Sequence, residues 1–297
     1  MTNRHDRYRQ LCTATSMPLH LQACWLDAVC GERGWDVVFA GSPDRPDGVW
    51  PFPKPDLFRR VGLPPFTSYG GPWLFYPQDA KRSTLYGFDK KVLTELAAGL
   101  PRWVYFRQNL LPETTNVLPL IWAGFKTNTR YTYRLHQGTA AAEWWESLES
   151  EIRKKIKADE PGSVLSEEDD PALLWKLRTA SLQRMGIRNG GSEVSFRRVY
   201  EAMRENSSGR MLVVRKANQP VAAQWLVTDH NMANFILSGK AVEQSYSNYL
   251  LLAHCVRWAL ENNLGVDFEG SMRPSLEHVL RRMGGILTPY HRIVRIK

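Results

Sequence analysis

The chain has 297 residues, of which 43% are hydrophobic and 11% aromatic. This composition excludes an intrinsically disordered protein, and the length leaves room for two domains or one large one. Residues 1–140 hold 17 Lys and Arg against 11 Asp and Glu, and residues 141–297 hold 22 against 19, so the net charge of +9 suits a phosphate-bearing ligand or a solvated basic surface without a specific partner.

The first half of the sequence predicts two helices among strands and loops. Apolar residues at helical spacing predict a helix over Pro18–Cys30, which Gly31 and Gly34 end. The proline- and glycine-rich stretch that includes Ser68–Pro72 (SYGGP) is typical of a loop that approaches a ligand closely. The remaining pattern predicts a short helix over residues 89–99 and extended segments at Trp35–Ala40, Gly48–Phe52, Trp103–Gln108, Leu118–Lys126 and Thr129–Leu135.

In the second half a helix is predicted over Ala141–Ala158, and the polar stretch Asp159–Asp170 predicts a loop. Antiparallel strands followed by a helix and a buried strand then indicate a mixed α/β layer, of which the first half is a rougher version. We therefore expect two α/β domains, residues 1–140 and 141–297. The remaining predicted helices are Pro171–Met185, Ser195–Asn206, Asn248–Asn262 and Pro274–Met283, and the strands are Met211–Lys216, Pro220–Thr228, Asn231–Gly239, Val266–Glu269 and His291–Ile296.

The sequence lacks the features of a secreted, membrane-spanning or metal-binding protein. No run of about eighteen apolar residues occurs, and the polar N-terminal residues are not followed by the apolar stretch of a secretory signal. The four cysteines are not spaced as zinc ligands, and none of the seven histidines stands at metal-ligand spacing from another ligand. We expect a cytoplasmic protein with no metal and no permanently bound cofactor.

Several segments, taken together and in a consistent order, resemble the Fem-like branch of the GNAT superfamily. They are WLDAV at Trp25–Val29, SYGGP at Ser68–Pro72, EIRKKIKADE at Glu151–Glu160, NYLLLAHCVRWALENN from Asn248, DFEGSM at Asp267–Met272 and GGILTPYHRI at Gly284–Ile293. The resemblance implies two tandem GNAT-like domains with mixed α+β sheets. It also implies an acyltransferase that joins an acyl or aminoacyl group to an amine of a small molecule or peptide, as in peptide bond formation.

The segment that would bind coenzyme A departs from the pattern of classical GNAT enzymes. In those enzymes a Gln/Arg-x-x-Gly-x-Gly/Ala turn binds the pyrophosphate through backbone N–H groups. The corresponding residues Ala241–Asn248 contain no glycine, and Glu243 would repel phosphate. The donor therefore stays open between an acyl-CoA, expected to bind weakly or not at all, and the aminoacyl-tRNA that Fem-type enzymes use. Tyr246 and Asn248 are the candidate contacts in this segment.

Three residues are candidates for the chemistry. Asp267 and Glu269 alternate along a predicted strand, so one of them could take the proton from an attacking amine. Alternatively, both are structural carboxylates that bond the backbone or an arginine. We expect Glu269 to be the general base and Asp267 to stabilise the fold, with Ser271 in the next turn near the substrate. Tyr290 could protonate a leaving group or be a core aromatic residue.

Other residues are candidates for substrate binding, each with a structural alternative. Tyr69, Gly70 and Gly71 could contact a ligand or pack within the loop. Arg153, Lys154 and Lys157 could bind phosphates or form a solvated helix face, and Gln224 could line the cleft. No G-x-S-x-G elbow, P-loop or dinucleotide fingerprint occurs, which favours direct attack of the amine over a covalent intermediate. The alternative function is a non-catalytic GNAT-like binding module for a cell-wall precursor, RNA or a protein.

Overall fold

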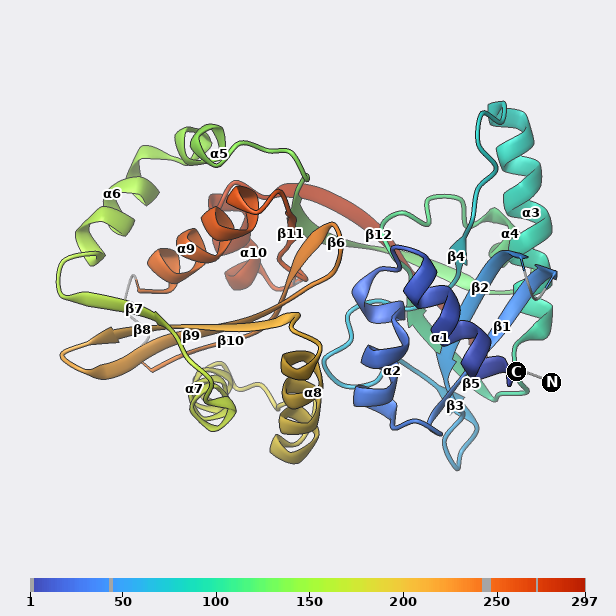
Figure 1. Cartoon of the computed structure of the whole chain (residues 1–297), viewed down its shortest axis with the longest axis horizontal. Helices are drawn as coiled ribbons and strands as arrows, with labels where there is room; N and C mark the ends of the chain where they lie inside the picture. Colours follow the sequence, from blue (N-terminus) through green and yellow to red (C-terminus); the bar gives the residue numbers. More distant parts are fainter. Residues whose placement is uncertain (1–2, 43–44, 242–246, 271, 297) are drawn as a thin grey trace. The chain divides into compact units, whose positions relative to one another are not determined.

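The computed structural model describes residues 3–42, 45–241, 247–270 and 272–296, and the chain divides into two compact units (Figure 1). The first unit consists of Met1–Arg130 and Pro289–Lys297, and the second of Tyr131–Thr288. Two strands, β6 (Lys126–Leu135) and β12 (Ile286–Ile296), each continue from one unit into the other. The sequence of the second unit is therefore inserted into that of the first.

The first unit contains two sets of paired strands. β1 (Trp35–Ser42) pairs antiparallel with β2 (Arg45–Pro53), and β2 pairs with β4 (Trp73–Leu74). In the other set β5 (Tyr105–Asn109) lies between β3 (Arg60–Val61), which is parallel to it, and β12, which is antiparallel. The helices of this unit are α1 (Arg4–Ala14), α2 (Ala23–Cys30), α3 (Arg82–Gly99) and α4 (Leu118–Trp122).

Two apolar clusters make up the core of the first unit. In one of them, Leu96 of α3 packs with Phe106 of β5 and Ile293 of β12. The other cluster contains Tyr69 of the SYGGP loop and Tyr290 of β12. Both faces of the β5–β12 pair are therefore close to packed side chains, and the loop is fixed to the same strands.

The helix predicted over Pro18–Cys30 is wrong as a single element. The chain forms a 3-10 turn at Leu19–Leu21, becomes extended at Gln22 and starts α2 at Ala23. The side-chain amide of Gln22 donates to the carbonyl of Met17 at 2.9 Å, a local bond that competes with helix continuation.

Two further differences concern polar and proline-containing segments. The extended segment predicted at Leu118–Lys126 is wrong at its start, because α4 occupies Leu118–Trp122 and Pro119 stands in its first turn, where a missing N–H leaves no bond unmade. Helix α1 was not predicted, since its sequence is polar and its one fully buried side chain is Tyr8. The Tyr8 hydroxyl donates to the carbonyl of Leu21 at 2.6 Å, so a tertiary contact holds this helix.

The second unit contains a sheet in which all neighbouring strands with a recorded register are antiparallel except β10 and β11. Its order is β6-β11-β10-β9-β8-β7. This mixed sheet agrees with the predicted α/β layer. The strands are β7 (Ser163–Glu167), β8 (Gly209–Lys216), β9 (Gln219–Thr228), β10 (Met232–Lys240) and β11 (Gly265–Asp267).

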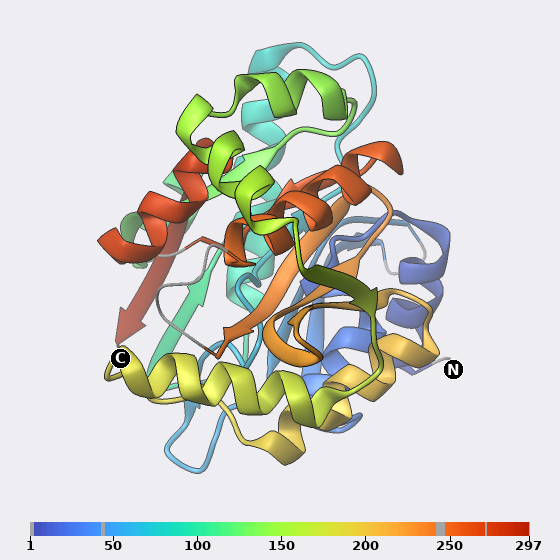
Figure 2. The same cartoon turned by 90° about the vertical axis from the view of Figure 1, so that its left-hand side faces the viewer.

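Helices cover both faces of this sheet (Figures 1 and 2). Leu226 of β9 packs in one core with Ile152 and Val256, which lie on helices of the first face. Its neighbour Trp225 points the other way, where its ring contacts Phe196 at 5.5 Å between centroids. The helices of the first face are α5 (Ala141–Ser147), α6 (Ser150–Asp159), α9 (Ser247–Glu261) and α10 (Pro274–Arg282), and those of the other are α7 (Pro171–Arg184) and α8 (Glu193–Glu205).

Two predictions for the second unit are wrong. The helix predicted over Ala141–Ala158 is divided into α5 and α6, because the backbone is extended at Leu148 and Glu149. The loop predicted over Asp159–Asp170 contains β7, which pairs antiparallel with β8. β7 is an edge strand with Val164 60% exposed, so its conformation follows from its partner rather than from a buried face of its own.

Candidate functional site

The sheet of the second unit opens between two of its strands. β10 and β11 pair in parallel over three residues each, from Met232 to Asn234 and from Gly265 to Asp267, although β10 continues to Lys240. The register of β10 with β9 shifts just after Asn234, which places a β-bulge where the pairing with β11 ends. Within the described ranges, β10 pairs with no other strand on that side.

Asp267 lies at the end of the paired region, and its carboxylate is fully buried. It accepts hydrogen bonds from Thr132 Oγ1 at 2.8 Å and from the Glu269 backbone N–H at 2.7 Å through Oδ1. Its Oδ2 accepts from Arg134 Nε at 2.7 Å, an ion pair in which the arginine side chain is only 12% exposed. The carboxylate therefore ties β11 to β6 and fixes the start of the following turn.

Glu269 lies after the strand, not within it, so the strand predicted over Val266–Glu269 is wrong at its end. β11 stops at Asp267, and Glu269 has a left-handed backbone with φ of 50°. The next residue, Gly270, donates its N–H to Thr132 Oγ1 at 2.9 Å. A Cβ on Gly270 would lie 2.6 Å from the Cα of Thr132, so only glycine allows this approach. Glu269 is thus held half-buried beside the opening of the sheet.

The helix after this turn is also attached to β6. The hydroxyl of Tyr133 donates to Oε1 of Glu277 on α10 at 2.6 Å. Burial, together with the bond to this carboxylate, raises the pKa of Tyr133 to about 12, so the phenol stays protonated at neutral pH. The turn that carries Glu269 is therefore bounded by fixed contacts on both sides.

Tyr69 and Tyr290, two further candidates, lie together in the first unit. Their rings meet edge to face with centroids 5.2 Å apart, and the side chains are 2% and 6% exposed. The hydroxyl of Tyr290 accepts a hydrogen bond from Arg130 Nε at 3.3 Å. Both tyrosines are core residues of this unit, whereas Asp267 and Glu269 belong to the other unit.

The two glycines of the SYGGP loop allow it to pack closely on the end of β5. Gly70 donates its N–H to the carbonyl of Asn109 at 2.8 Å, and a Cβ there would lie 2.8 Å from Leu63 Cδ2. Gly71 has a φ of 104°, and a Cβ there would lie 2.5 Å from Leu110 Cδ2. The described contacts of both glycines are thus with the protein itself.

The basic helix α6 carries ion pairs as well as free charge. Arg153 pairs with Glu146, whereas the side chains of Lys154 and Lys157 are exposed to solvent. Lys155, on the same helix, pairs with Glu151. This arrangement is that of a solvated helix face with two lysines at which an anionic ligand could still bind.

The remaining candidates are dispersed. Gln224 on β9 is 2% exposed, and its Nε2 donates to the carbonyl of Trp225 at 2.9 Å. Trp225 is 1% exposed and belongs to the aromatic packing against α8. Asn248 is half-buried in the first turn of α9. Tyr246 and Ser271 lie outside the described residues.

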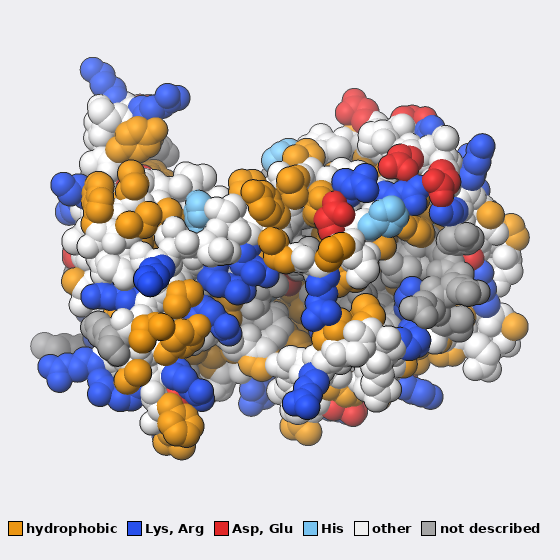
Figure 3. All heavy atoms as spheres, turned by 180° about the vertical axis from the view of Figure 1, so that it is seen from behind, with side chains coloured by type: hydrophobic (Ala, Val, Ile, Leu, Met, Phe, Trp, Pro, Cys, Tyr) orange, Lys and Arg blue, Asp and Glu red, His pale blue; other side chains and the backbone are white. Residues whose placement is uncertain are grey.

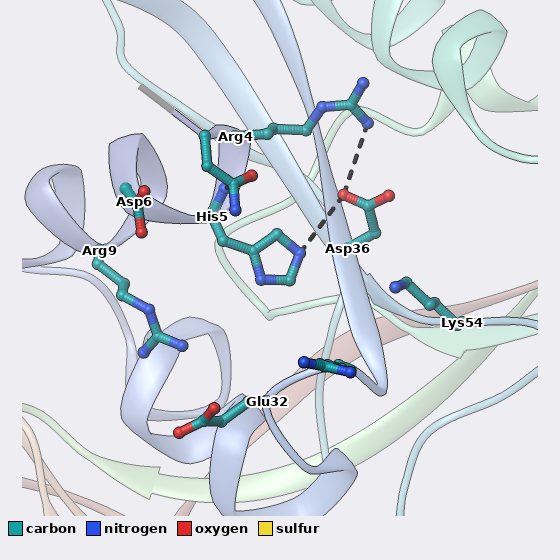
Figure 4. Close-up of a pocket in the computed structure, with 9 residues that line it drawn as sticks. Arg4, His5, Asp6, Arg9, Glu32, Asp36 and Lys54 are labelled. Atoms are coloured by element: carbon teal, nitrogen blue, oxygen red, sulfur yellow. Dashed lines mark hydrogen bonds and ion pairs between the residues drawn. The ribbon is translucent and has the colours of Figure 1, made fainter. Parts of the chain in front are cut away.

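A charged hollow of about 770 Å³ lies at the start of the first unit (Figure 4). His5 stacks on Trp35 with ring centroids 4.3 Å apart, and its Nε2 lies 3.7 Å from Asp36. Arg4 also approaches Asp36, at 3.5 Å, so the cations are partly neutralised within the hollow. It is lined by Asn3, Arg4, His5, Asp6, Arg9, Glu32, Arg33, Asp36 and Lys54.

Sequence patterns did not identify the partners of Asp267. Thr132 and Arg134 lie two residues apart on β6, and Arg130 precedes them at the same spacing. Alternating polar residues within a strand of which Thr132 is fully buried indicate a polar contact on that face. This alternation in the predicted strand Thr129–Leu135 was the available signal.

Two negative findings apply to the described ranges alone. Within them, no helix is long and apolar enough to cross a membrane. In the same ranges, no group of three or more His, Cys, Asp and Glu side chains is arranged to hold a metal ion.

Comparison with known proteins agrees with these features. Residues 146–273, which include the opening of the sheet and the turn at Glu269, match the family described as an acetyltransferase (GNAT) domain. No functionally curated protein matches the sequence of the chain.

Solved structures resemble the chain over nearly its whole length. FemX superposes with a TM-score of 0.67 at 12% identity, covering 98% of this chain and 96% of FemX. The C-terminal domain (DUF2156) of a protein assigned as a lysylphosphatidylglycerol synthetase from Agrobacterium fabrum gives 0.57 at 12% identity, covering 99% and 92%. A tandem GNAT protein from the clavulanic acid biosynthesis pathway gives 0.52 at 12% identity, covering 98% and 93%.

The sequence match and the structural likenesses agree with each other and with the two compact units. At these identities the likenesses establish the fold, and the family match establishes the type of the second unit's domain. The chain is thus a GNAT-superfamily protein, with a GNAT acetyltransferase domain at residues 146–273 and the two-domain fold of the Fem-like branch.

Proposed function

We propose that the chain is an N-acyltransferase that transfers an acyl or aminoacyl group to an amine, with Glu269 as the general base. The observation that carries the proposal is the opening between β10 and β11 inside the GNAT domain, with the half-buried Glu269 beside it. A carboxylate at such a position can accept a proton from a bound ammonium or amine group.

The opening supports this chemistry because it leaves part of β10 without a strand partner. Backbone N–H groups at an open strand edge can donate hydrogen bonds to the carbonyl oxygen of an acyl group. The β-bulge after Asn234 re-aims the backbone at the same place. The proposed acyl site is therefore the part of β10 from Phe235 onward.

In the proposed reaction the amine nitrogen attacks the carbonyl carbon of a thioester or an ester. A C–N bond forms, Glu269 takes a proton from the nitrogen, and the C–S or C–O bond to the leaving group breaks. The released thiolate or alkoxide then takes up a proton. Asp267 acts on this step only through position, because its Oδ1 holds the backbone N–H of Glu269.

For the donor we propose an aminoacyl-tRNA ahead of an acyl-CoA. Residues 241–248 contain no glycine with which to form the pyrophosphate turn of classical GNAT enzymes, and residues 242–246 lie outside the described ranges. The net charge of +9 favours a polyanionic donor of either kind. Neither donor is a permanently bound cofactor.

The proposal is tested with the Glu269→Gln variant. Glutamine is nearly isosteric but cannot take the proton, so turnover should fall about a hundredfold or more while substrate binding changes little. Aminoacyl-tRNAs and acyl-CoA thioesters are offered with amine acceptors, and release of free tRNA or free thiol is followed. Glu261→Gln, the same change at an exposed position near the end of α9, is the matched control and should retain full activity.

Retention of full activity in Glu269→Gln would show that this residue is not the base. If the wild-type protein binds these donors or acceptors but transfers nothing, the alternative of a non-catalytic binding module is correct. Native mass spectrometry of the purified protein separates the two cases, because a binding module would carry its ligand unchanged.

A further inference from the structure

Nearly all of the net positive charge belongs to the first unit. Met1–Arg130 with Pro289–Lys297 holds 19 Lys and Arg against 11 Asp and Glu, whereas Tyr131–Thr288 holds 20 against 19. The first unit thus carries an excess of 8 and the second an excess of 1. In Figure 3 the part of the surface that belongs to the first unit shows many Lys and Arg side chains and few carboxylates. An anionic ligand is therefore expected to bind the first unit.

Three arginines of the first unit gather on one face of β5, β6 and β12, and we name Arg107, Arg130 and Arg292 the arginine cluster. In the register of β5 and β12, Arg292 lies opposite Asn109 and Val294 opposite Arg107. Paired residues of antiparallel strands share a face, as do residues two apart, so Arg107 and Arg292 lie on the same side. Arg130 reaches this side as well, because its Nε donates to the hydroxyl of Tyr290, two residues before Arg292.

No carboxylate neutralises the arginine cluster. Within the described ranges, none of its three members forms an ion pair, although the other arginine of β12, Arg295, lies over the rings of Trp103 and Phe125. Burial, and then the positive charges of Arg130 and Arg107, lower the pKa of Arg292. Arg130 and Arg292 are half-buried, so their mutual repulsion is only partly screened by solvent.

The buried ends of the cluster are held by neutral acceptors. Arg292 Nε donates to Asn109 Oδ1 at 2.8 Å, and Arg130 Nε donates to Tyr290 Oη at 3.3 Å. Each bond fixes one edge of a guanidinium group and leaves its two terminal nitrogens for another partner. Two planar groups with fixed edges and free outer nitrogens suit oxygens of tetrahedral phosphoryl groups.

The SYGGP loop supports both acceptors. The carbonyl of Ser68 accepts a hydrogen bond from Asn109 Nδ2 at 2.8 Å, which turns the Oδ1 of Asn109 toward Arg292. The ring of Tyr69 packs against that of Tyr290, whose hydroxyl holds Arg130. The loop is therefore connected to both arginines through one intermediate residue each.

We propose that the arginine cluster is a binding site for a diphosphate or for two adjacent phosphate groups of a ligand. Three cations without carboxylates match the two or more negative charges of such a group, whereas one carboxylate would neutralise only one of them. Asn109 and Tyr290 are positioning residues for this site. The site belongs to the first unit and does not depend on the acyl transfer proposed for the second.

Calorimetric titration of the full chain with inorganic pyrophosphate at low salt tests the site. The wild-type protein should bind, and Arg292→Gln and Arg107→Gln should each weaken binding tenfold or more. Arg82→Gln removes one charge from an exposed arginine at the start of α3 and is the matched control, which should bind like the wild type. Asn109→Ala keeps all three cations but frees Arg292, so it should weaken binding severalfold, which an effect of net charge alone would not do.

Acetate and a short single-stranded RNA complete the set of ligands. Acetate should bind at least tenfold more weakly than pyrophosphate. RNA that competes with pyrophosphate and loses affinity in Arg292→Gln would identify a nucleic-acid backbone as the source of the phosphates, whereas RNA that does not compete leaves a small diphosphorylated ligand.

The melting temperature of Arg107→Gln separates a binding role from a structural one. Removal of one of three like charges should not lower the melting temperature of the ligand-free protein. A clear loss of stability in this variant with unchanged pyrophosphate binding would overturn the proposal. So would the absence of pyrophosphate binding by the wild type at about 1 mM, or equal weakening in Arg82→Gln.

Discussion

Replacement of Asp267 by asparagine tests the contacts that hold the turn of Glu269 against β6. Asparagine keeps one acceptor oxygen but puts an NH₂ group in place of the other oxygen. Wherever this group is placed, it faces a donor: Arg134 Nε on one side, or Thr132 Oγ1 and the Glu269 N–H on the other. The substitution also removes the negative charge from a fully buried position beside an arginine that is 12% exposed.

The expected cost follows from these contacts. A hydrogen bond to a charged group contributes about 1.5–3 kcal/mol, and loss of one partner of a buried ion pair typically costs about 3–5 kcal/mol. We therefore expect Asp267→Asn to lower the free energy of unfolding of the second unit by about 3–5 kcal/mol. With a urea dependence of about 2–3 kcal/mol per molar, the midpoint should fall by about 1–2 M.

Urea unfolding followed by tryptophan fluorescence measures this change, since Trp144 and Trp225 are buried in the second unit. Glu167→Gln is the control, because Glu167 pairs with Arg210 at 3.3 Å on the surface, where a pair contributes about 1 kcal/mol or less. If Asp267→Asn unfolds within about 1 kcal/mol of the wild type, the network does not stabilise the fold as argued.

Two further predictions concern a glycine and a cysteine of the first unit. Gly71→Ala should cost about 1–3 kcal/mol in thermal melting, because its φ of 104° and the 2.5 Å approach to Leu110 Cδ2 both disfavour a Cβ; Gly138→Ala, with φ of 83° but no atom within 4 Å, measures the backbone part alone, and equal losses would refute the overlap. Burial raises the pKa of the Cys12 thiol to about 11, so about one thiol in a thousand is ionised at pH 8 and alkylation should speed up about tenfold per pH unit toward that pKa. Peptide mapping after iodoacetamide treatment measures this, and labelling of the folded protein as fast as in urea would contradict it.

Strands whose own sequence favours a strand were predictable. β9 and β10 consist of continuous runs of β-forming and apolar residues, and both were predicted within one or two residues of their bounds. β7 was missed because its pairing with β8, not its composition, makes it a strand. α4 was missed because Leu118–Trp122 is apolar without helical periodicity, and the position of Pro119 becomes informative only once the helix start is known.

The candidate site was predictable in part. The segment DFEGSM was recognisable from its residues, and both carboxylates were named. Their different environments were not, because the bond between Asp267 and Arg134 joins residues 133 positions apart. The left-handed backbone of Glu269 was also hidden, since a non-glycine residue with positive φ gives no signal in the sequence and is fixed here by the contacts of its neighbours.

The return of β12 to the first unit has a consequence for synthesis on the ribosome. Asn109 on β5 meets Arg292 on β12, a residue made 183 positions later. Until then one edge of β5 lacks its partner, and the cluster around Phe106 lacks Ile293. The second unit receives nearly all of its residues earlier, so a nascent chain can complete its later-starting unit first. The unfinished earlier unit then exposes an open strand edge, which is the place where a chaperone would be needed to prevent association between nascent chains.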